Sequence, residues 1–232
     1  MNKKVLVVLM VLVLAVAGLS AKGNIKAGVQ LGWGFDTGSL KCLIQDVNAK
    51  FEAKNNGFAF ALTGEYAFDK NWSVKANLGM MFAGKTTLVE SDGKTSADLK
   101  SEKEAGPYFD VAIDAKYTYA INKQISVAGL AGLELVSGQL LKDLDYILES
   151  SLRNSSFEDS NFYNVAFGVN LGVEGAYQLT NEVAITAGFS GAILFVNSFS
   201  SSEMATFLTG YGEKPSIISF YLRPYVGATY AF

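Results

Sequence analysis

The chain has 232 residues, of which 50% are hydrophobic, and it contains no histidine and a single cysteine, Cys42. Histidine is the commonest general base and a common metal ligand, so its absence argues against most enzymatic and transition-metal functions, and a lone cysteine excludes an internal disulfide. The 19 basic residues against 22 acidic ones exclude the basic balance of a nucleic-acid-binding protein. We therefore expect no cofactor, no metal site and no nucleic-acid partner.

The first 21 residues have the features of a secretory signal peptide. Two lysines precede an apolar run over residues 5–17, and small residues follow as far as Ala21. The run is shorter than the about 20 apolar residues that a membrane-spanning helix needs. We expect cleavage after Ala21 or after Ala17, and a single domain over residues 22–232.

Strict alternation of apolar residues with polar or small ones, the period of a β-strand, recurs in eight segments of the chain. In chain order these are residues 25–35, 58–68, 72–82, 107–121, 124–136, 163–178, 183–195 and 220–232. The last segment is typical, because Leu222, Val226 and Tyr230 fall on one face while Arg223 and Tyr225 fall on the other. Each segment is therefore expected to form a strand with one apolar face.

The connections between these segments alternate between long and short. The long ones are residues 36–56, 84–106, 137–161 and 198–216, and the short ones are residues 69–71, 122–123 and 180–181. An even number of strands with tight turns at one end and long loops at the other is typical of outer-membrane barrels. The sequence thus predicts an all-β protein, an eight-stranded antiparallel up-and-down transmembrane β-barrel with four long extracellular loops and three short periplasmic turns.

Aromatic residues on the apolar face gather near both ends of the strands. Near the short turns these are Phe68, Trp72, Tyr119, Tyr177, Tyr230 and Phe232, and near the long loops they are Trp33, Phe35, Phe58, Phe82, Phe109, Tyr163, Phe195 and Phe220. Two such belts are typical of a membrane-facing surface. The alternative is a soluble eight-stranded barrel of the lipocalin type, which would turn its apolar face inward and would not need alternating loop lengths.

With this architecture and the ending from Arg223 to Phe232, the chain resembles small eight-stranded outer-membrane proteins of the OmpA transmembrane domain, OmpX and OmpW type. The resemblance implies location in the outer membrane of a diderm bacterium, after export through the cleaved signal peptide. It also implies that Tyr230 and Phe232 are a C-terminal insertion signal for the assembly machinery. Enzymatic members of this type use an essential histidine, which this chain lacks, so we expect no enzyme.

The polar faces of the strands are expected to fill the barrel interior with charged side chains. These are Lys26, Glu65, Lys75, Asp110, Asp114, Lys116, Glu134, Glu174 and Arg223. Eight strands enclose only enough space for side chains, and charges removed from water must pair. The sequence therefore predicts an interior ion-pair network, which is either a purely structural plug or the lining of a narrow polar pathway.

Two specific pairings are predicted within this network. The tight turn centred on Lys70 places Glu65 opposite Lys75 on the neighbouring strand, which predicts an ion pair between them. Arg223 lies nearer the middle of its strand, where Asp114 and Glu134 are its expected partners.

Two of the long loops carry apolar residues near helical spacing. The residues are Leu40, Ile44 and Val47 in the first loop, together with Phe51, and Leu141, Leu144, Leu148 and Leu152 in the third. We expect two short amphipathic helices that form an apolar extracellular rim. They either pack on each other and the membrane surface or line an apolar mouth for a hydrophobic small molecule, as the likeness to the OmpW type implies.

Two functions remain open at this stage. The first is an integral outer-membrane barrel that binds or passes small solutes, including hydrophobic ones, through or along a narrow barrel. The second is a non-conducting structural or adhesive surface protein that acts through its extracellular loops. The expected partners are outer-membrane lipid, the outer-membrane assembly machinery, and either a small hydrophobic ligand or a host surface molecule.

Overall fold

A computed structural model describes most of the strand regions of the chain. The described residues are 24–44, 47–83, 85–91, 102–104, 107–138, 164–199 and 216–232. They form ten strands: β1 (Ile25–Ile44), β2 (Val47–Ala67), β3 (Trp72–Ala83), β4 (Lys85–Ser91), β5 (Glu102–Glu104), β6 (Pro107–Ala120), β7 (Ile125–Gly138), β8 (Asn164–Gln178), β9 (Val183–Phe199) and β10 (Ser216–Ala231). Within these ranges no helix is long and apolar enough to cross a membrane. The predicted signal peptide lies outside the described residues.

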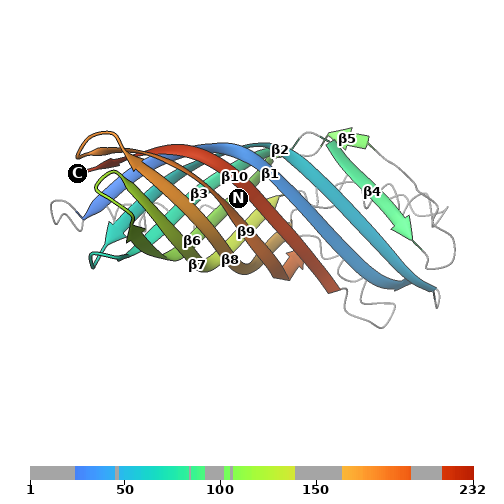
Figure 1. Cartoon of the computed structure of the whole chain (residues 1–232). Coiled ribbons are helices and arrows are strands. Elements are labelled where there is room, and N and C mark those ends of the chain that lie inside the picture. The colour runs from blue at the N-terminus through green and yellow to red at the C-terminus, as the bar shows by residue number, and fades with distance from the viewer. Residues whose placement is uncertain are drawn as a thin grey trace, which may run out of the picture.

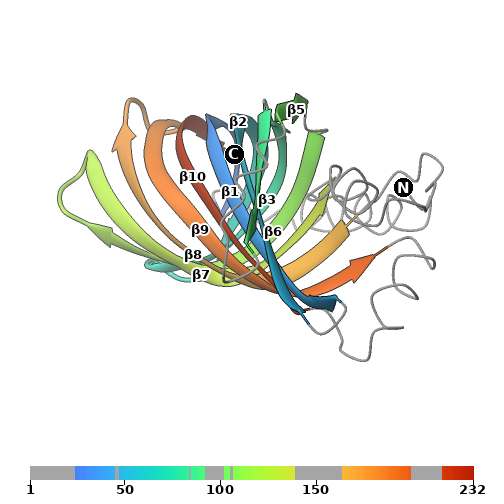
Figure 2. The same cartoon turned by 90° about the vertical axis from the view of Figure 1, so that its right-hand side faces the viewer.

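Eight of the strands close into an antiparallel barrel (Figures 1 and 2). Strands β1, β2, β3 and β6 to β10 each pair with the next in chain order, and β10 pairs with β1 to close the ring. The closing pairing runs from Lys26 opposite Ala231 to Lys41 opposite Ser216. The predicted eight-stranded antiparallel barrel is therefore confirmed.

The three short turns lie together at one end of the barrel, which we call the short-turn end (Figure 1). In the turn after β6, the Oδ1 of Asn122 accepts hydrogen bonds of 2.8 Å from the backbone N–H groups of Gln124 and Ile125. In the turn after β8, the Oγ1 of Thr180 accepts hydrogen bonds from the N–H groups of Glu182 and Val183 at 3.2 and 3.0 Å. Short polar side chains thus satisfy turn amides that the strands cannot pair.

The outer face of the barrel is apolar along the described strands. Leu31, Leu62, Leu171 and Val226, on four different strands of the barrel, expose 46%, 49%, 59% and 59% of their surface. Aromatic side chains of both predicted belts are also exposed, with an edge-to-face contact of 5.0 Å between the ring centroids of Trp72 and Tyr117 at the short-turn end. An apolar exterior of this extent is stable only in lipid.

The first long loop predicted from the sequence is largely a β-hairpin. Strand β1 continues to Ile44 and β2 begins at Val47, so residues that were expected to form a loop and an amphipathic helix pair as strands, with Leu40 opposite Phe51 and Ile44 opposite Val47. The helix predicted there is wrong. Charged and polar residues indicated a loop, but a hairpin that extends beyond the membrane has no lipid-facing side and needs no alternation.

The hairpin is part of a sheet that extends past the barrel at the end opposite the short turns (Figure 1). Within the predicted second loop, β4 pairs with β2 from Lys50 opposite Ser91 to Lys54 opposite Thr87, and β5 pairs with β4. On the other side of the hairpin, β10 pairs with β1 as far as Ser216. We call β4, β5 and the paired ends of β1, β2 and β10 the sheet extension. The third-loop residues Leu141, Leu144, Leu148 and Leu152 lie outside the described residues.

Candidate functional site in the barrel lumen

All nine charged residues predicted for the interior lie on the inner face of the barrel. Eight of them are buried, with exposures of 6% or less, and only Lys26 keeps a substantial exposed part, 40% of its side chain. Strand β6 shows how they are arranged. Counted from the short-turn end, its inward residues are Lys116, Asp114, Asp110 and Tyr108, and each takes part in a different group of contacts. The lumen is therefore filled by stacked groups of polar side chains.

The group nearest the short turns is built on two carboxylates. The Nζ of Lys116 lies 2.8 Å from the Oε2 of Glu65 and 2.7 Å from the Oε1 of Glu174. Glu174 also accepts hydrogen bonds from Lys75 and, at 2.8 Å, from the hydroxyl of Tyr225. Lys26 reaches the other oxygen of Glu65 at 3.3 Å. These residues come from six strands, so the group connects most of the barrel wall.

The pairing within this group differs from the prediction. Glu65 does lie directly opposite Lys75 in the register of β2 and β3. The ammonium of Lys75 nevertheless contacts Glu174 on β8 and lies 5.5 Å from the ring centre of Tyr225. A lysine side chain is long enough to cross so narrow a lumen, so the register does not decide its partner.

Arg223 also has a partner other than the two predicted. Its Nη1 donates to both carboxylate oxygens of Asp110, at 3.0 and 3.1 Å, and its guanidinium lies 5.7 Å from the ring centre of Tyr221. Asp114 instead accepts from two amides, the Nδ2 of Asn170 at 2.8 Å and the Nδ2 of Asn77 at 3.2 Å. The amides were not singled out from the sequence, although their inward positions could have indicated them.

Glu134 is the exception among the nine. It is 1% exposed, and neither of its carboxylate oxygens has a hydrogen-bond partner among the described residues. Its direct neighbours in the register are Ala112 on β6 and Gly168 on β8, which offer no polar side chain.

The lumen above Arg223 is closed by apolar and hydrogen-bonded side chains. Met81 and Leu194 are each 1% exposed and are among the largest fully buried side chains. Asn55 donates from its Nδ2 to the hydroxyl of Tyr108 at 2.6 Å and to the Oδ2 of Asp36 at 3.4 Å. Both Asp36 and Asn55 fall in the segment that was predicted to be a loop, which is why their role was missed.

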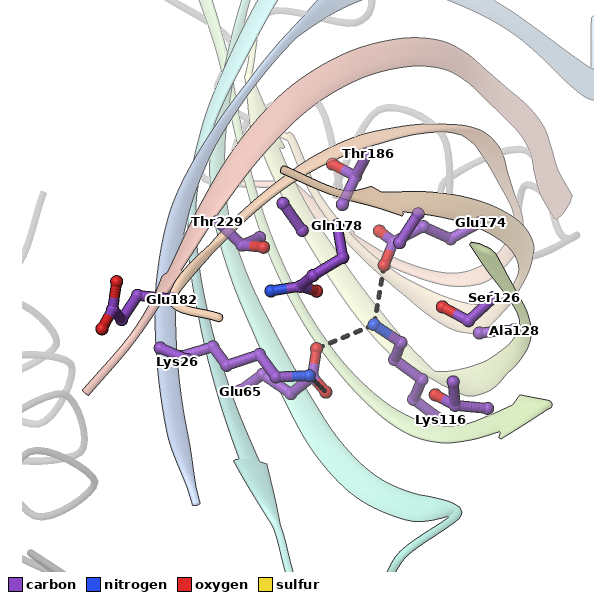
Figure 3. A pocket seen from close by; sticks show the side chains of 14 residues that line it. Lys26, Glu65, Lys116, Ser126, Ala128, Glu174, Gln178, Glu182, Thr186 and Thr229 are labelled. Atoms are coloured by element: carbon purple, nitrogen blue, oxygen red, sulfur yellow. Dashed lines mark hydrogen bonds and ion pairs between the residues drawn. The ribbon is translucent and has the colours of Figure 1, made fainter. Parts of the chain in front are cut away.

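A small cavity lies at the short-turn end (Figure 3). It has a volume of about 60 Å³, which is room for about two water molecules. Its wall carries the charged groups of Lys26, Glu65, Lys116 and Glu174 and the hydroxyls of Thr118, Ser126, Thr186 and Thr229. The hydrogen bonds of Lys116 to the two carboxylates form its inner boundary.

An apolar exterior, a polar interior and a closed antiparallel ring define an integral membrane β-barrel. The model of the outer membrane protein beta-barrel domain family matches residues 6–214, which is most of the chain. The protein therefore belongs to the outer-membrane β-barrel domain family and resides in the outer membrane, in contact with its lipid.

Solved structures agree with this fold. The outer membrane protease OmpT from Escherichia coli has a TM-score of 0.53 at 10% sequence identity, with 92% of this chain and 99% of that one covered. The outer membrane protein OprG from Pseudomonas aeruginosa has a TM-score of 0.53 at 11% identity, with 91% and 97% covered. At such low identity these likenesses show the fold alone. A search of curated proteins found no significant match.

Proposed function

We propose that this protein is a non-conducting outer-membrane barrel that acts at the cell surface through its sheet extension. The observation that carries the proposal is the filled lumen: a solute would have to separate the contacts of Glu174 with Lys75 and Lys116, the contact of Arg223 with Asp110, and the packing of Met81. Buried ion pairs of this kind are costly to separate, because each charge would be left without a partner away from bulk water.

The sheet extension supplies the surface for contact. In the orientation we propose, the short turns face the periplasm and the sheet extension faces the outside. Among the described residues, β5 pairs only with β4, so it forms an edge of the sheet. Edge strands present backbone donors and acceptors to which an extended segment of another protein can add. A host surface protein with an exposed strand or extended segment fits this chemistry.

A second function, the binding or passage of small solutes, is supported by a different observation. The cavity of about 60 Å³ reaches into the lumen from the short-turn end and is lined by charged groups and hydroxyls. In this alternative the apolar rim, which includes Leu144 and Leu148, captures hydrophobic compounds at the opposite end. We rank this function second, because the groups above the cavity are buried and paired.

Several accompanying expectations belong to the same proposal. The proposal includes export through a signal peptide over residues 1–21 and recognition of Tyr230 and Phe232 by the assembly machinery. It also includes the absence of enzymatic activity. The described C-terminal residues agree with a lipid-facing insertion signal, because Tyr230 and Phe232 are 48% and 65% exposed and their rings are 5.1 Å apart. One similar structure is a protease, so the chain should also be assayed for proteolysis of unfolded casein.

Conductance in planar bilayers tests the proposal. The refolded mature protein, with insertion confirmed by protease protection, should give no discrete current steps. Steps that change in the double variant Glu174→Gln/Lys75→Met would overturn the proposal and favour passage through the lumen. Binding of an apolar fluorescent probe that is lost in Leu144→Ser/Leu148→Ser would favour the apolar mouth.

Surface contact needs its own experiment. Bacteria that express the chain are compared with bacteria that express a variant in which residues 39–52 are replaced by Asn-Gly. Adhesion to a layer of cultured epithelial cells should fall in the variant, while the amount of folded protein in the outer membrane stays the same. Equal adhesion with altered solute uptake would support transport instead.

A further inference from the structure

The middle of the lumen contains more buried hydrogen-bond acceptors than donors. Both carboxylate oxygens of Glu134 and the Oδ1 atoms of Asn77 and Asn170 are buried without a hydrogen-bond partner among the described residues. The groups in the same condition that can donate include the Nε of Arg223 and, on the same or a neighbouring strand, the hydroxyls of Tyr221 and Ser190. Buried acceptors without donors are rare in folded proteins, so a group of four calls for an explanation such as a bound ion.

The orientation of the two amides is determined by their shared partner. A carboxylate only accepts, so both Asn77 and Asn170 must turn their Nδ2 groups toward Asp114, at 3.2 and 2.8 Å. Their carbonyl oxygens are then left over as acceptors on either side of Asp114. The excess of acceptors is therefore a consequence of the hydrogen bonds and not of an arbitrary choice between amide oxygen and nitrogen.

The register places Glu134 between these groups. Glu134 lies on β7, between β6 with Asp110 and Asp114 and β8 with Asn170. Its direct neighbours, Ala112 and Gly168, are small and carry no side-chain group that could pair with the carboxylate. Asn77 lies opposite Ala112, so Asn77, Ala112 and Glu134 form one row across β3, β6 and β7, and Asn170 lies two residues from Gly168 on β8.

The charges in this region favour a cation. Three carboxylates, those of Asp110, Asp114 and Glu134, are accompanied by one guanidinium, which is hydrogen-bonded to Asp110. Lys75 lies opposite Asp114 in the register, but its ammonium contacts Glu174. A carboxylate buried without a cation beside it takes up a proton, so a bound cation would keep Glu134 ionised where water alone would not.

We propose that the lumen binds a monovalent alkali cation between Glu134, Asn77 and Asn170. No group of three acidic, histidine or cysteine side chains in the described part of the chain could hold a metal ion, which argues against a divalent ion. One carboxylate with neutral amide oxygens suits a hard cation of single charge, whose hydration shell such oxygens can replace. This inference is independent of whether the barrel conducts.

Thermal unfolding in different salts tests this site. The mature protein is refolded in detergent with sodium, potassium or N-methyl-D-glucamine chloride at equal ionic strength, so that the cation is present when the lumen closes. An ion that binds only the folded barrel raises the unfolding midpoint as its concentration increases. The midpoint should be higher in sodium or potassium than in N-methyl-D-glucamine, and Glu134→Gln should abolish the difference.

A matched control is Glu182→Gln, because Glu182 is exposed in a short turn and should leave the salt dependence unchanged. Equal midpoints of the wild type in all three salts, or the same dependence in Glu134→Gln, would overturn the proposal. If Glu134→Gln does not refold, crystals of the wild type grown with thallium in place of sodium decide the question. An anomalous peak beside Glu134 supports the site, and its absence contradicts it.

Discussion

Lys75 on β3 crosses the lumen to Glu174 on β8, 99 residues later, although Glu65 lies directly opposite it on β2. The reason lies in Glu174, which accepts from Lys75, Lys116 and Tyr225 and so joins four strands through one carboxylate. Glu65 is already engaged by Lys116 and Lys26. Lys26 contacts the residue directly opposite it in the register, Glu65, whereas the ammonium of Lys75 follows the distribution of charge in the lumen and not its cross-strand position.

Glu174→Gln should strongly destabilise the barrel. The substitution removes the charge that balances Lys75 and Lys116, and breaking a buried ion pair on one side costs about 3–5 kcal/mol. The free energy of unfolding in urea, measured for the protein refolded in lipid vesicles, checks this. Glu182→Gln, at an exposed turn position, should change it by less than about 0.5 kcal/mol.

The same experiment is extended by adding Lys75→Met. Because the first change leaves Lys75 as an unpaired buried ammonium, the double variant should be less destabilised than the sum of the two single variants. Strictly additive effects would show that the two side chains do not interact in the folded barrel.

Tyr225→Phe and Tyr230→Phe compare the two faces of one strand. The hydroxyl of Tyr225 donates to Glu174 at 2.8 Å inside the lumen, whereas Tyr230 is 48% exposed on the outer face. A hydrogen bond to a charged group contributes about 1.5–3 kcal/mol, so Tyr225→Phe should lower the free energy of unfolding by about that amount. Tyr230→Phe should have a much smaller effect, and equal effects would contradict the assigned faces.

Two glycines of β7 allow a similar comparison for packing. A β-carbon at Gly132 would collide with the backbone carbonyl of Ile113 and lie 2.7 Å from the Cα of Asp114, whereas one at Gly129 would meet nothing within 4 Å. Gly132→Ala should therefore destabilise the barrel by about 1–3 kcal/mol. Gly129→Ala should be neutral or stabilising by up to about 1 kcal/mol. The free energies of unfolding of both variants in urea check this. A larger loss of stability in Gly129→Ala than in Gly132→Ala would be inconsistent with the faces described for these glycines.

The two tryptophans report on the position of the membrane. Trp33 and Trp72 are 46% and 43% exposed on the outer face. Trp72 begins β3 beside a short turn, whereas Trp33 lies opposite Phe58, toward the end of the barrel that carries the sheet extension. In vesicles, the variant Trp33→Phe reports the fluorescence of Trp72 alone, and the variant Trp72→Phe reports that of Trp33 alone. Lipids brominated close to the headgroup should quench both more strongly than lipids brominated deep in the chain. Stronger deep quenching of either would contradict two interfacial belts.

The fold could be predicted from the sequence because lipid and lumen impose opposite chemistry on alternate residues of every strand. The residue ranges expected for β3, β6 and β9 begin at the same residues as these strands in the structure. Beyond the membrane this constraint ends. A solvated hairpin carries no alternation that marks it as a strand. Residues 36–44 and 47–56 were therefore expected to form a loop with a helix.

The composition of the lumen could be predicted, but its contacts could not. Alternation is enough to place Glu65, Lys75 and Arg223 on the inner face. Their partners depend on how far each side chain reaches across the barrel, as the bond of Arg223 to Asp110, 113 residues earlier, shows. The amides of Asn77 and Asn170 and the hydroxyl of Tyr225 were overlooked because only charged residues were singled out on the inner faces, although these three also hold inward positions.

The charged groups of the lumen also bear on how the barrel folds. Glu174 obtains its donors from β3, β6 and β10, so its contacts are complete only when strands from both ends of the chain have met. A partly assembled sheet would expose these charges to lipid without partners, which is strongly unfavourable. Closure should therefore be cooperative, and the interior of the barrel favours the complete ring over any open intermediate.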